Sequence, residues 1–197
     1  MTSSIFLSAS VPDPERDPKY YRTADVSAIR DAVRALVTIV LPKARLVWGG
    51  HPAITPLVRV VAEDVGITGS DRVRLFQSNF FRNQMPTSNA SFEYVERVRA
   101  VRGDREASLQ RMRRRMIGSE VFAGGIFIGG MDGVETEYQI FRELQPTAKA
   151  FPIASTGGAA LIIFRRERRR LPPELIGELR DDLAYPSLFR RLLPFLQ

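Results

Sequence analysis

Glycines and acidic residues follow one another closely between residues 129 and 137, directly after an apolar run that ends at Ile128. Glycine lets the backbone approach a ligand closely, and a helix that starts beside it directs free N–H groups at an anion. An amphipathic helix pattern begins here, with acidic residues in its first turn. We therefore predict a loop that binds phosphate or ribose, with ligand-binding residues Gly129, Gly130, Met131, Gly133 and Val134.

Two other glycine pairs also lie between an apolar run and a helix pattern. They are Gly49-Gly50, followed by His51, and Gly157-Gly158, preceded by Thr156. Ser8 and Ser10 end the first predicted strand, and Ser78 ends the third. Because the carboxyl ends of parallel strands meet at one edge of a sheet, we expect all these residues to border one pocket. His51, the sole histidine, could contact a ligand or simply cap the helix that follows.

Arginines provide the candidate cations. The predicted helix after Asp104 carries Arg111 and the run from Arg113 to Arg115, and one or two of these could point to the glycine loop while the others are solvated. Arg16, in a proline-rich loop after the first strand, could also face a ligand or belong to a plain surface loop.

The elements that must position these residues alternate between strands and helices. Strands are predicted at residues 5–10, 45–48, 73–78, 121–128 and 148–154, with a further strand favoured within 90–101. Asp25 is expected to cap a helix that Pro42 ends, and a second helix should span 53–65 and close at Gly66. The loop containing Phe80 and Phe81 is expected to supply core or lid packing rather than a base-stacking surface.

This alternation predicts an α/β fold: a Rossmann-like, doubly wound, mainly parallel sheet with helices on both faces. We expect residues 1–167 to form a nucleotide-binding domain. After the arginine-rich run that begins at Arg165, residues 168–197 would form a helical tail that docks on this domain or on a partner subunit.

Composition excludes several classes of protein. The 197 residues include no cysteine and one histidine, so thiolate zinc sites, disulfides and multi-histidine metal sites are excluded, and we predict no metal and no cofactor. No stretch has the roughly 20 apolar residues that span a bilayer, which favours a cytoplasmic protein without a membrane partner.

The net charge of +7 suits an anionic ligand, but no motif indicates nucleic acid. The dinucleotide fingerprint and the Walker A motif are absent.

The stretch GGMDGVETE, residues 129–137, resembles the P-G-G-x-G-T-x-x-E motif of LOG proteins, the cytokinin-activating phosphoribohydrolases. Together with LSAS, WGGHPAITPL, SLQRMRRRM and STGGAA, it is similar to the SLOG superfamily, which also includes DprA and the N-terminal region of TRPM channels. The chain looks most like SLOG modules of bacterial nucleotide-signalling and antiviral defence systems. The resemblance implies a Rossmann-like fold and a nucleotide-type ligand, and we also predict a homodimer or larger assembly. The resemblance also implies that Glu137 and Arg113, or a neighbouring arginine, act on the ligand's ribose.

The chain departs from the LOG motif at three points. Ile128 replaces the proline, Val134 replaces the threonine, and one extra residue, Met131 or Asp132, precedes Gly133. A longer loop would place a phosphate differently, so we expect binding or sensing of a nucleotide or derivative, ADP-ribose-like or NAD-derived. The alternative is a nucleotide N-glycosidase related to LOG enzymes, with Glu137 and Arg113 as catalytic residues.

Overall fold

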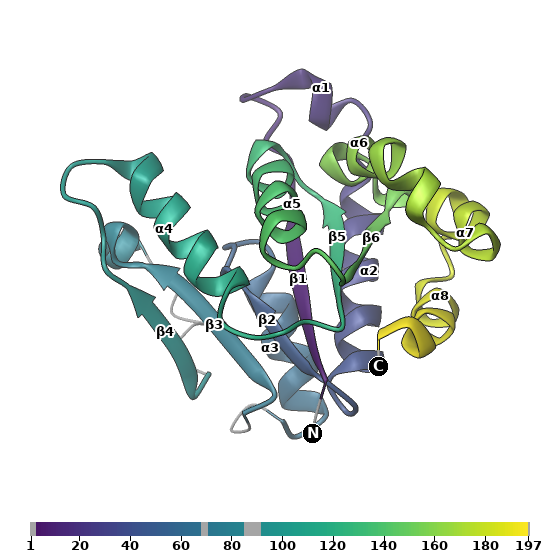
Figure 1. The fold of residues 1–197 in the computed structure, drawn as a ribbon, viewed down its shortest axis with the longest axis horizontal. Helices are drawn as coiled ribbons and strands as arrows, with labels where there is room; N and C mark the ends of the chain where they lie inside the picture. The colour runs from purple at the N-terminus through teal and green to yellow at the C-terminus, as the bar shows by residue number, and fades with distance from the viewer. Residues whose placement is uncertain (1–2, 68–70, 85–91, 197) are drawn as a thin grey trace.

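Six parallel strands form one sheet in the order β4-β3-β2-β1-β5-β6. This computed structural model describes residues 3–67, 71–84 and 92–196. The strands are β1 Ser4–Ser10, β2 Arg45–Trp48, β3 Val73–Ser78, β4 Tyr94–Val98, β5 Gly124–Gly129 and β6 Lys149–Ile153 (Figure 1). The predicted α/β, doubly wound fold is confirmed, and every pairing between the described strands is parallel.

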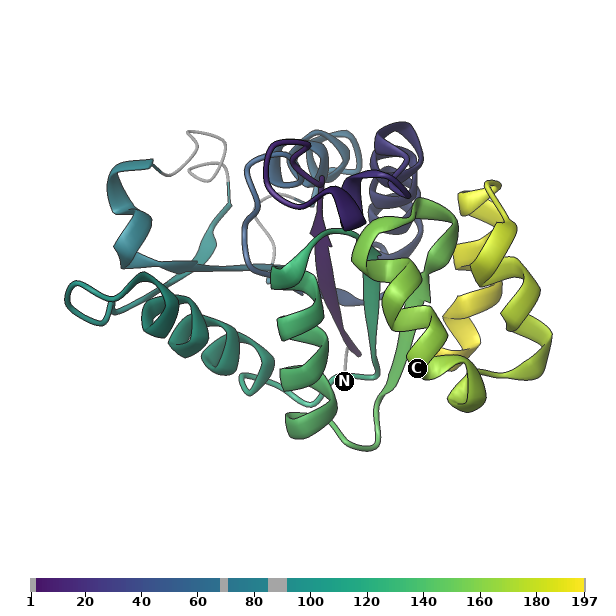
Figure 2. The same cartoon turned by 90° about the horizontal axis from the view of Figure 1, so that it is seen from above.

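Helices connect the strands and cover both faces of the sheet. They are α1 Pro18–Tyr21, α2 Val26–Val40, α3 Thr55–Asp64, α4 Arg105–Ile117, α5 Asp132–Leu144, α6 Gly158–Glu167, α7 Ile176–Asp181 and α8 Tyr185–Leu192. Figure 2 shows α2 and α3 on one side of the sheet and α4 and α5 on the other. The expected caps are present: Asp25 accepts a hydrogen bond from the Ala28 N–H, and Asp104 accepts one from the Ala107 N–H. Short 3-10 turns are η1 Asn79–Gln84, η3 Ala154–Thr156, η4 Arg168–Arg170, η5 Pro173–Leu175 and η6 Leu193–Leu196.

Alternation along the strands divides the core into two layers. Ile5 and Leu7 of β1 pack in the layer under α2 and α3, whereas Phe6 packs in the layer under α4 and α5. The Phe6 ring stacks on Phe141 of α5, with ring centroids 5.5 Å apart. Ser8 has the same strand parity as Phe6, so its side chain faces the layer of α5.

The strand order places β1 between β2 and β5, where the direction of winding reverses. In the register of the sheet Ser8 lies beside Phe127, and Ser10 lies beside Gly129. Ligands of open α/β sheets bind outside the carboxyl ends of the strands at this reversal. The fold therefore directs attention to the ends of β1 and β5.

Several element boundaries differ from the expectation. The proline-rich loop contains one helical turn, α1, which Asp17 caps through the Lys19 N–H. β5 begins at Gly124, and Val121 is 87% exposed rather than buried in a strand. α3 begins at Thr55 with Pro56 in its first turn, so Pro52 belongs to the preceding turn. The strand favoured within 90–101 is β4, and residues 90 and 91 of that range lie outside the described part.

The C-terminal segment packs on the chain's own sheet domain. Leu188, Phe189 and Leu192 of α8 are fully buried in the same apolar layer as α2. Phe195 stacks edge-on against Phe151 of β6. These contacts account for the apolar face of the segment without a second subunit.

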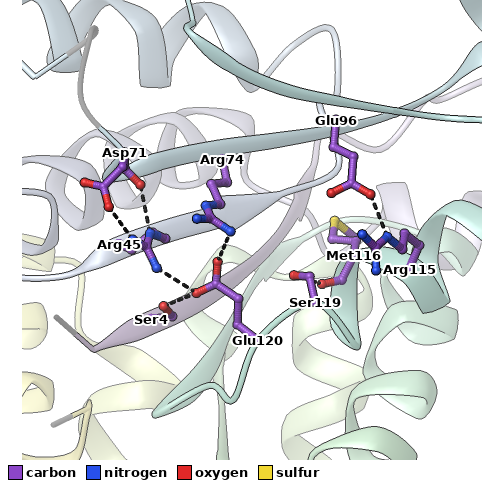
Figure 3. Close-up of polar contacts among 9 residues, drawn as sticks. All are labelled: Ser4, Arg45, Asp71, Arg74, Glu96, Arg115, Met116, Ser119 and Glu120. Carbon is purple, nitrogen blue, oxygen red and sulfur yellow. Dashed lines mark hydrogen bonds and ion pairs between the residues drawn. The ribbon is translucent and has the colours of Figure 1, made fainter. Parts of the chain in front are cut away.

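The amino edge of the sheet, opposite the carboxyl ends, is joined by a polar network around Glu120 (Figure 3). The Glu120 carboxylate pairs with Arg45 of β2 at 3.2 Å and with Arg74 of β3 at 3.0 Å. It also accepts a hydrogen bond from Ser4 at the start of β1. Through these contacts Glu120 connects the loop after α4 to three adjacent strands, β1, β2 and β3.

Replacing Glu120 by Gln should lower the free energy of unfolding by roughly 2 kcal/mol, a value between those of exposed and fully buried pairs. The change removes the carboxylate that Arg45 and Arg74 share, and within the described residues only Arg45 keeps another, that of Asp71. The Glu120 side chain is 11% exposed. Glu143→Gln is the matched control, since Glu143 forms a solvent-exposed pair with Arg114. Urea unfolding of both variants measures the difference, and equal losses would contradict the role given to Glu120.

Candidate functional site

A cavity of about 380 Å³ lies at the carboxyl edge of the sheet, bordered by α4 and α5. The residues predicted from the sequence that line it are Ser10, Arg16, Gly49, Gly50, His51, Ser78, Arg113, Met131, Gly133, Val134 and Glu137. Further lining residues include Leu7, Ala9, Trp48, Pro52, Gln77, Phe81, Arg105, Glu106, Leu109, Met112 and Asp132. The expected convergence of strand ends on one pocket therefore holds for β1, β2, β3 and β5.

Glu137 and Arg113 form an ion pair in the wall of this cavity. Nε of Arg113 lies 3.6 Å from Oε1 of Glu137, and the two side chains are 10% and 15% exposed. Oε2 of Glu137 accepts a 2.6 Å hydrogen bond from the Ser8 hydroxyl. Burial raises the pKa of Glu137, while the Arg113 charge and the Ser8 hydrogen bond offset part of that rise. Ser8 does not line the cavity itself; it orients the carboxylate that does.

The structure distinguishes the three candidate arginines of α4. Arg113 is buried and also pairs with Glu106 at 3.4 Å. Arg114 pairs with Glu143 on the protein surface, and exposed Arg111 donates to the Arg99 carbonyl. Nε of Arg113 is buried without a hydrogen-bond partner among the described residues. Of the three, Arg113 is the one that faces the cavity.

Gly133 makes room for this arginine. A Cβ atom at Gly133 would lie 3.0 Å from Nη2 of Arg113, closer than side-chain carbons normally approach. Gly133 does not adopt a positive φ, so its role is clearance rather than backbone conformation. A helix start without a side chain therefore lets the guanidinium reach the first turn of α5.

The N-terminus of α5 opens onto the cavity. Its N-cap residue, Met131, makes no side-chain capping hydrogen bond, in contrast to Asp25 and Asp104 at α2 and α4. Met131 is buried, and its Sδ accepts a 3.4 Å hydrogen bond from the Asp13 N–H. The first N–H groups of a helix have no intrahelical acceptor, so this start can donate to an anion.

The turn after β2 supplies a second wall. Gly50 has φ +70°, and a Cβ there would lie 2.7 Å from Leu75 and 3.0 Å from Nε2 of Gln77. Gly49 borders Glu137 without such crowding, since its Cβ would make only ordinary contacts. His51 lines the cavity, and its Nδ1 accepts a 3.2 Å hydrogen bond from the Ala53 N–H in the turn before α3. The N-cap of α3 is Ile54, without a side-chain capping bond, so His51 does not cap this helix, and its contact with a ligand stays a prediction. Burial and the Arg16 charge lower the His51 pKa.

The third glycine turn does not border the cavity, which corrects the expectation for Thr156, Gly157 and Gly158. The Thr156 hydroxyl accepts from the Gly129 N–H at 2.8 Å, and a Cβ at Gly158 would lie 2.6 Å from the Gly130 oxygen. Gly129 and Gly130 are also absent from the lining. These two glycine turns pack on each other, because the chain crosses there too closely for side chains.

Sequence reasoning missed Gln77, Arg105 and the cavity role of Phe81. Phe81 lines the cavity and Phe80 is exposed, so neither packs in the core layers. Arg105 lies over the Phe81 ring, with Cζ 5.8 Å from its centroid. The only signal for Gln77 was its position beside Ser78 at a strand end.

Acidic residues at the start of α5 diverge, as the helix geometry predicts. Asp132 pairs with Arg16, and Glu135 accepts from Tyr20 and pairs with Arg166. Within residues 3–67, 71–84 and 92–196, no group of three or more potential metal ligands comes together. Over the same residues, the helices are all too short or too polar to cross a bilayer.

The parallel sheet and its edge cavity define a Rossmann-like α/β protein. The chain belongs to the SLOG cluster3 family, whose model matches residues 19–193. The sequence-based assignment to the SLOG superfamily is thereby confirmed. No curated protein matches the chain. Among solved structures, the X-ray structure of TM1055, a structural-genomics target, matches with a TM-score of 0.56 and 16% identity, over 83% of this chain and 81% of that one. At this identity the match supports the fold alone.

Replacing Gly157 by Ala should destabilise the protein by roughly 3–5 kcal/mol, because the new Cβ adds a steric clash to an unfavourable positive φ. That Cβ would lie 1.8 Å from the Thr23 carbonyl oxygen. Gly66→Ala is the control, since Gly66 has nearly the same φ, +68°, and nothing within 4 Å of its Cβ. It should cost only about 1–2 kcal/mol. Thermal unfolding compares the two, and similar losses would refute the packing role.

Proposed function

We propose that this protein binds a nucleotide or nucleotide derivative in the edge cavity and acts as a sensing module. The observation that carries the proposal is the buried Arg113–Glu137 pair beside the uncapped start of α5. Membership of the SLOG cluster3 family supports a nucleotide-related role. Three finer points stay predictions: an ADP-ribose-like or NAD-derived ligand in a signalling or defence system, a cytoplasmic location and a homo-oligomeric assembly.

The start of α5 is the proposed phosphate site. Backbone N–H groups near Gly133 and the helix dipole favour a negative charge there, and the Arg113 guanidinium lies against the same turn. Arg16 stands at the mouth of the cavity, where its exposed ion pair with Asp132 can exchange for a phosphate contact. The net charge of +7 adds a general attraction for anions.

Glu137 is the proposed ribose contact. Its carboxylate is held by Ser8 through one oxygen, while the other faces Arg113 at a distance too long for a good hydrogen bond. Carboxylate oxygens have about four acceptor positions, so Glu137 retains capacity for ribose hydroxyls. Gly49 leaves the space beside this carboxylate free of a side chain.

The alternative is cleavage of the N-glycosidic bond, favoured by the burial of Glu137. A desolvated carboxylate stabilises positive charge that develops on ribose more strongly than a hydrated one. The extra residue before Gly133, Met131 or Asp132, however, lies at the helix start, where both residues line the cavity. The insertion therefore changes the position of a bound phosphate relative to the LOG motif, which is why binding is our first choice.

Arg113→Gln should weaken nucleotide binding at least about tenfold, since charge-assisted hydrogen bonds are worth about 1.5–3 kcal/mol. The matched control is Arg114→Gln, the next residue of α4, which pairs with Glu143 on the surface. Calorimetry and thermal shift with AMP, NAD and ADP-ribose provide the measurement. If both variants bound the compounds as tightly as the parent chain does, the binding site would lie elsewhere. If the parent chain bound none of the three compounds, the proposed ligands would be rejected.

Incubation of the chain with the same three compounds should release no free base and no ribose phosphate, as measured by chromatography. Release that disappears in Glu137→Gln would establish the glycosidase instead. That variant keeps the size of the side chain and removes its charge, so a folded but inactive Glu137→Gln protein would assign the chemistry to the carboxylate.

A further inference from the structure

Gln77 is a buried amide with an unused acceptor in the wall of the cavity. It is the penultimate residue of β3 and is 6% exposed. Its Oε1 atom has no hydrogen-bond partner within the described part of the chain. A buried polar atom without a partner destabilises the fold, and one that belongs to a cavity-lining residue can gain the missing bond from a ligand.

Gly50 leaves room for the Gln77 amide at the cavity wall. A Cβ atom at Gly50 would lie 3.0 Å from Nε2 of Gln77, whereas Oε1 is covered by protein atoms and reaches the cavity when the amide turns about its last side-chain bond. Gly50 and Gln77 both line the cavity. Leu75 shares the strand face of Gln77 and belongs to the apolar layer below, which gives the amide no polar neighbour there.

Gln77 lies far from the proposed phosphate site. β3 is separated from β5 by β2 and β1, so the two strands lie about 14 Å apart at the usual strand spacing. A phosphate and ribose bound beside α5 do not reach that distance, whereas an attached base extends toward it. The cavity also offers the Phe81 ring and the Arg105 guanidinium, surfaces on which a base can stack.

We propose that Gln77 determines the base specificity of this pocket by accepting a hydrogen bond from an N–H group on the edge of the ligand's base. The proposal rests on the nucleotide-binding function proposed above. The unused oxygen requires a donor, so the class of ligand is a nucleotide whose base presents an exocyclic amine or a ring N–H. Nε2 of Gln77 can donate in return to a neighbouring ring nitrogen or carbonyl.

The test uses Gln77→Met, which keeps the length of the side chain and removes both its acceptor and its donor. The probes are AMP and IMP, whose bases carry an edge N–H, purine riboside 5′-monophosphate, whose base carries none, and ribose 5-phosphate. The parent chain should bind AMP, IMP or both at least about tenfold more tightly than purine riboside monophosphate. Gln77→Met should abolish this difference and leave the Kd of ribose 5-phosphate unchanged.

Two controls separate recognition from damage. Gln110→Met makes the same exchange on the exposed face of α4 and should leave every Kd unchanged. Unliganded Gln77→Met should unfold at the same or a higher temperature than the parent chain, because it removes an unpaired buried oxygen. A lower unfolding temperature would show that the amide has structural partners, and would overturn the argument.

The remaining outcomes distinguish this inference from the function on which it rests. If the parent chain binds the three nucleotides equally, or if Gln77→Met weakens ribose 5-phosphate as much as AMP, Gln77 does not read the base although the pocket binds nucleotides. If the parent chain binds none of the four probes, the proposed function itself fails, and the role of Gln77 fails with it.

Discussion

The site depends on the placement of two opposite charges out of water. Arg113 of α4 and Glu137 of α5 lie side by side with little exposure, and each charge lowers the cost of burying the other. Their separation leaves Nε of Arg113 without a hydrogen bond, so the pair is incompletely satisfied. A ligand with several acceptors and hydroxyl donors would complete it. The buried, incompletely hydrogen-bonded pair therefore lowers the stability of the fold at this edge, whereas a well-packed apolar contact would not.

The surrounding elements are shaped to permit this pair. Gly133 removes the side chain that would meet the guanidinium, and Ser8 on the central strand fixes the carboxylate. The direction of winding reverses at β1. As a result α4 and α5 cover the same face of the sheet, although β4 and β5 lie on opposite sides of β1 in the strand order. The opposite edge carries the Glu120 network, which contacts three strands and lines no part of the cavity.

Much of the fold and part of the site could be predicted from the sequence, because they follow from local pattern. Apolar runs, glycine turns and aspartate caps indicated the strands, the helices and the parallel direction of the strands. The spacing of the motif directed attention to Glu137, which the cavity does contain. The same glycine signature led to a wrong prediction for Gly157 and Gly158, which do not line the cavity. A glycine lets the backbone approach a ligand or a neighbouring segment of chain equally well, so the sequence does not distinguish the two. Only the position of Thr23 and Gly130 beside them distinguishes the two uses.

The sequence by itself determined an α/β sheet, a glycine-containing helix start after a strand and an acidic residue one turn into that helix. Those features depend on periodicity and on the conformational range of glycine, both of which are local properties. Tertiary structure alone decided that Arg113 rather than Arg111 or Arg114 faces the pocket, because that depends on how α4 is rotated against α5. It also decided that Gln77 keeps an unpaired oxygen, since a missing partner depends on every element packed around the residue.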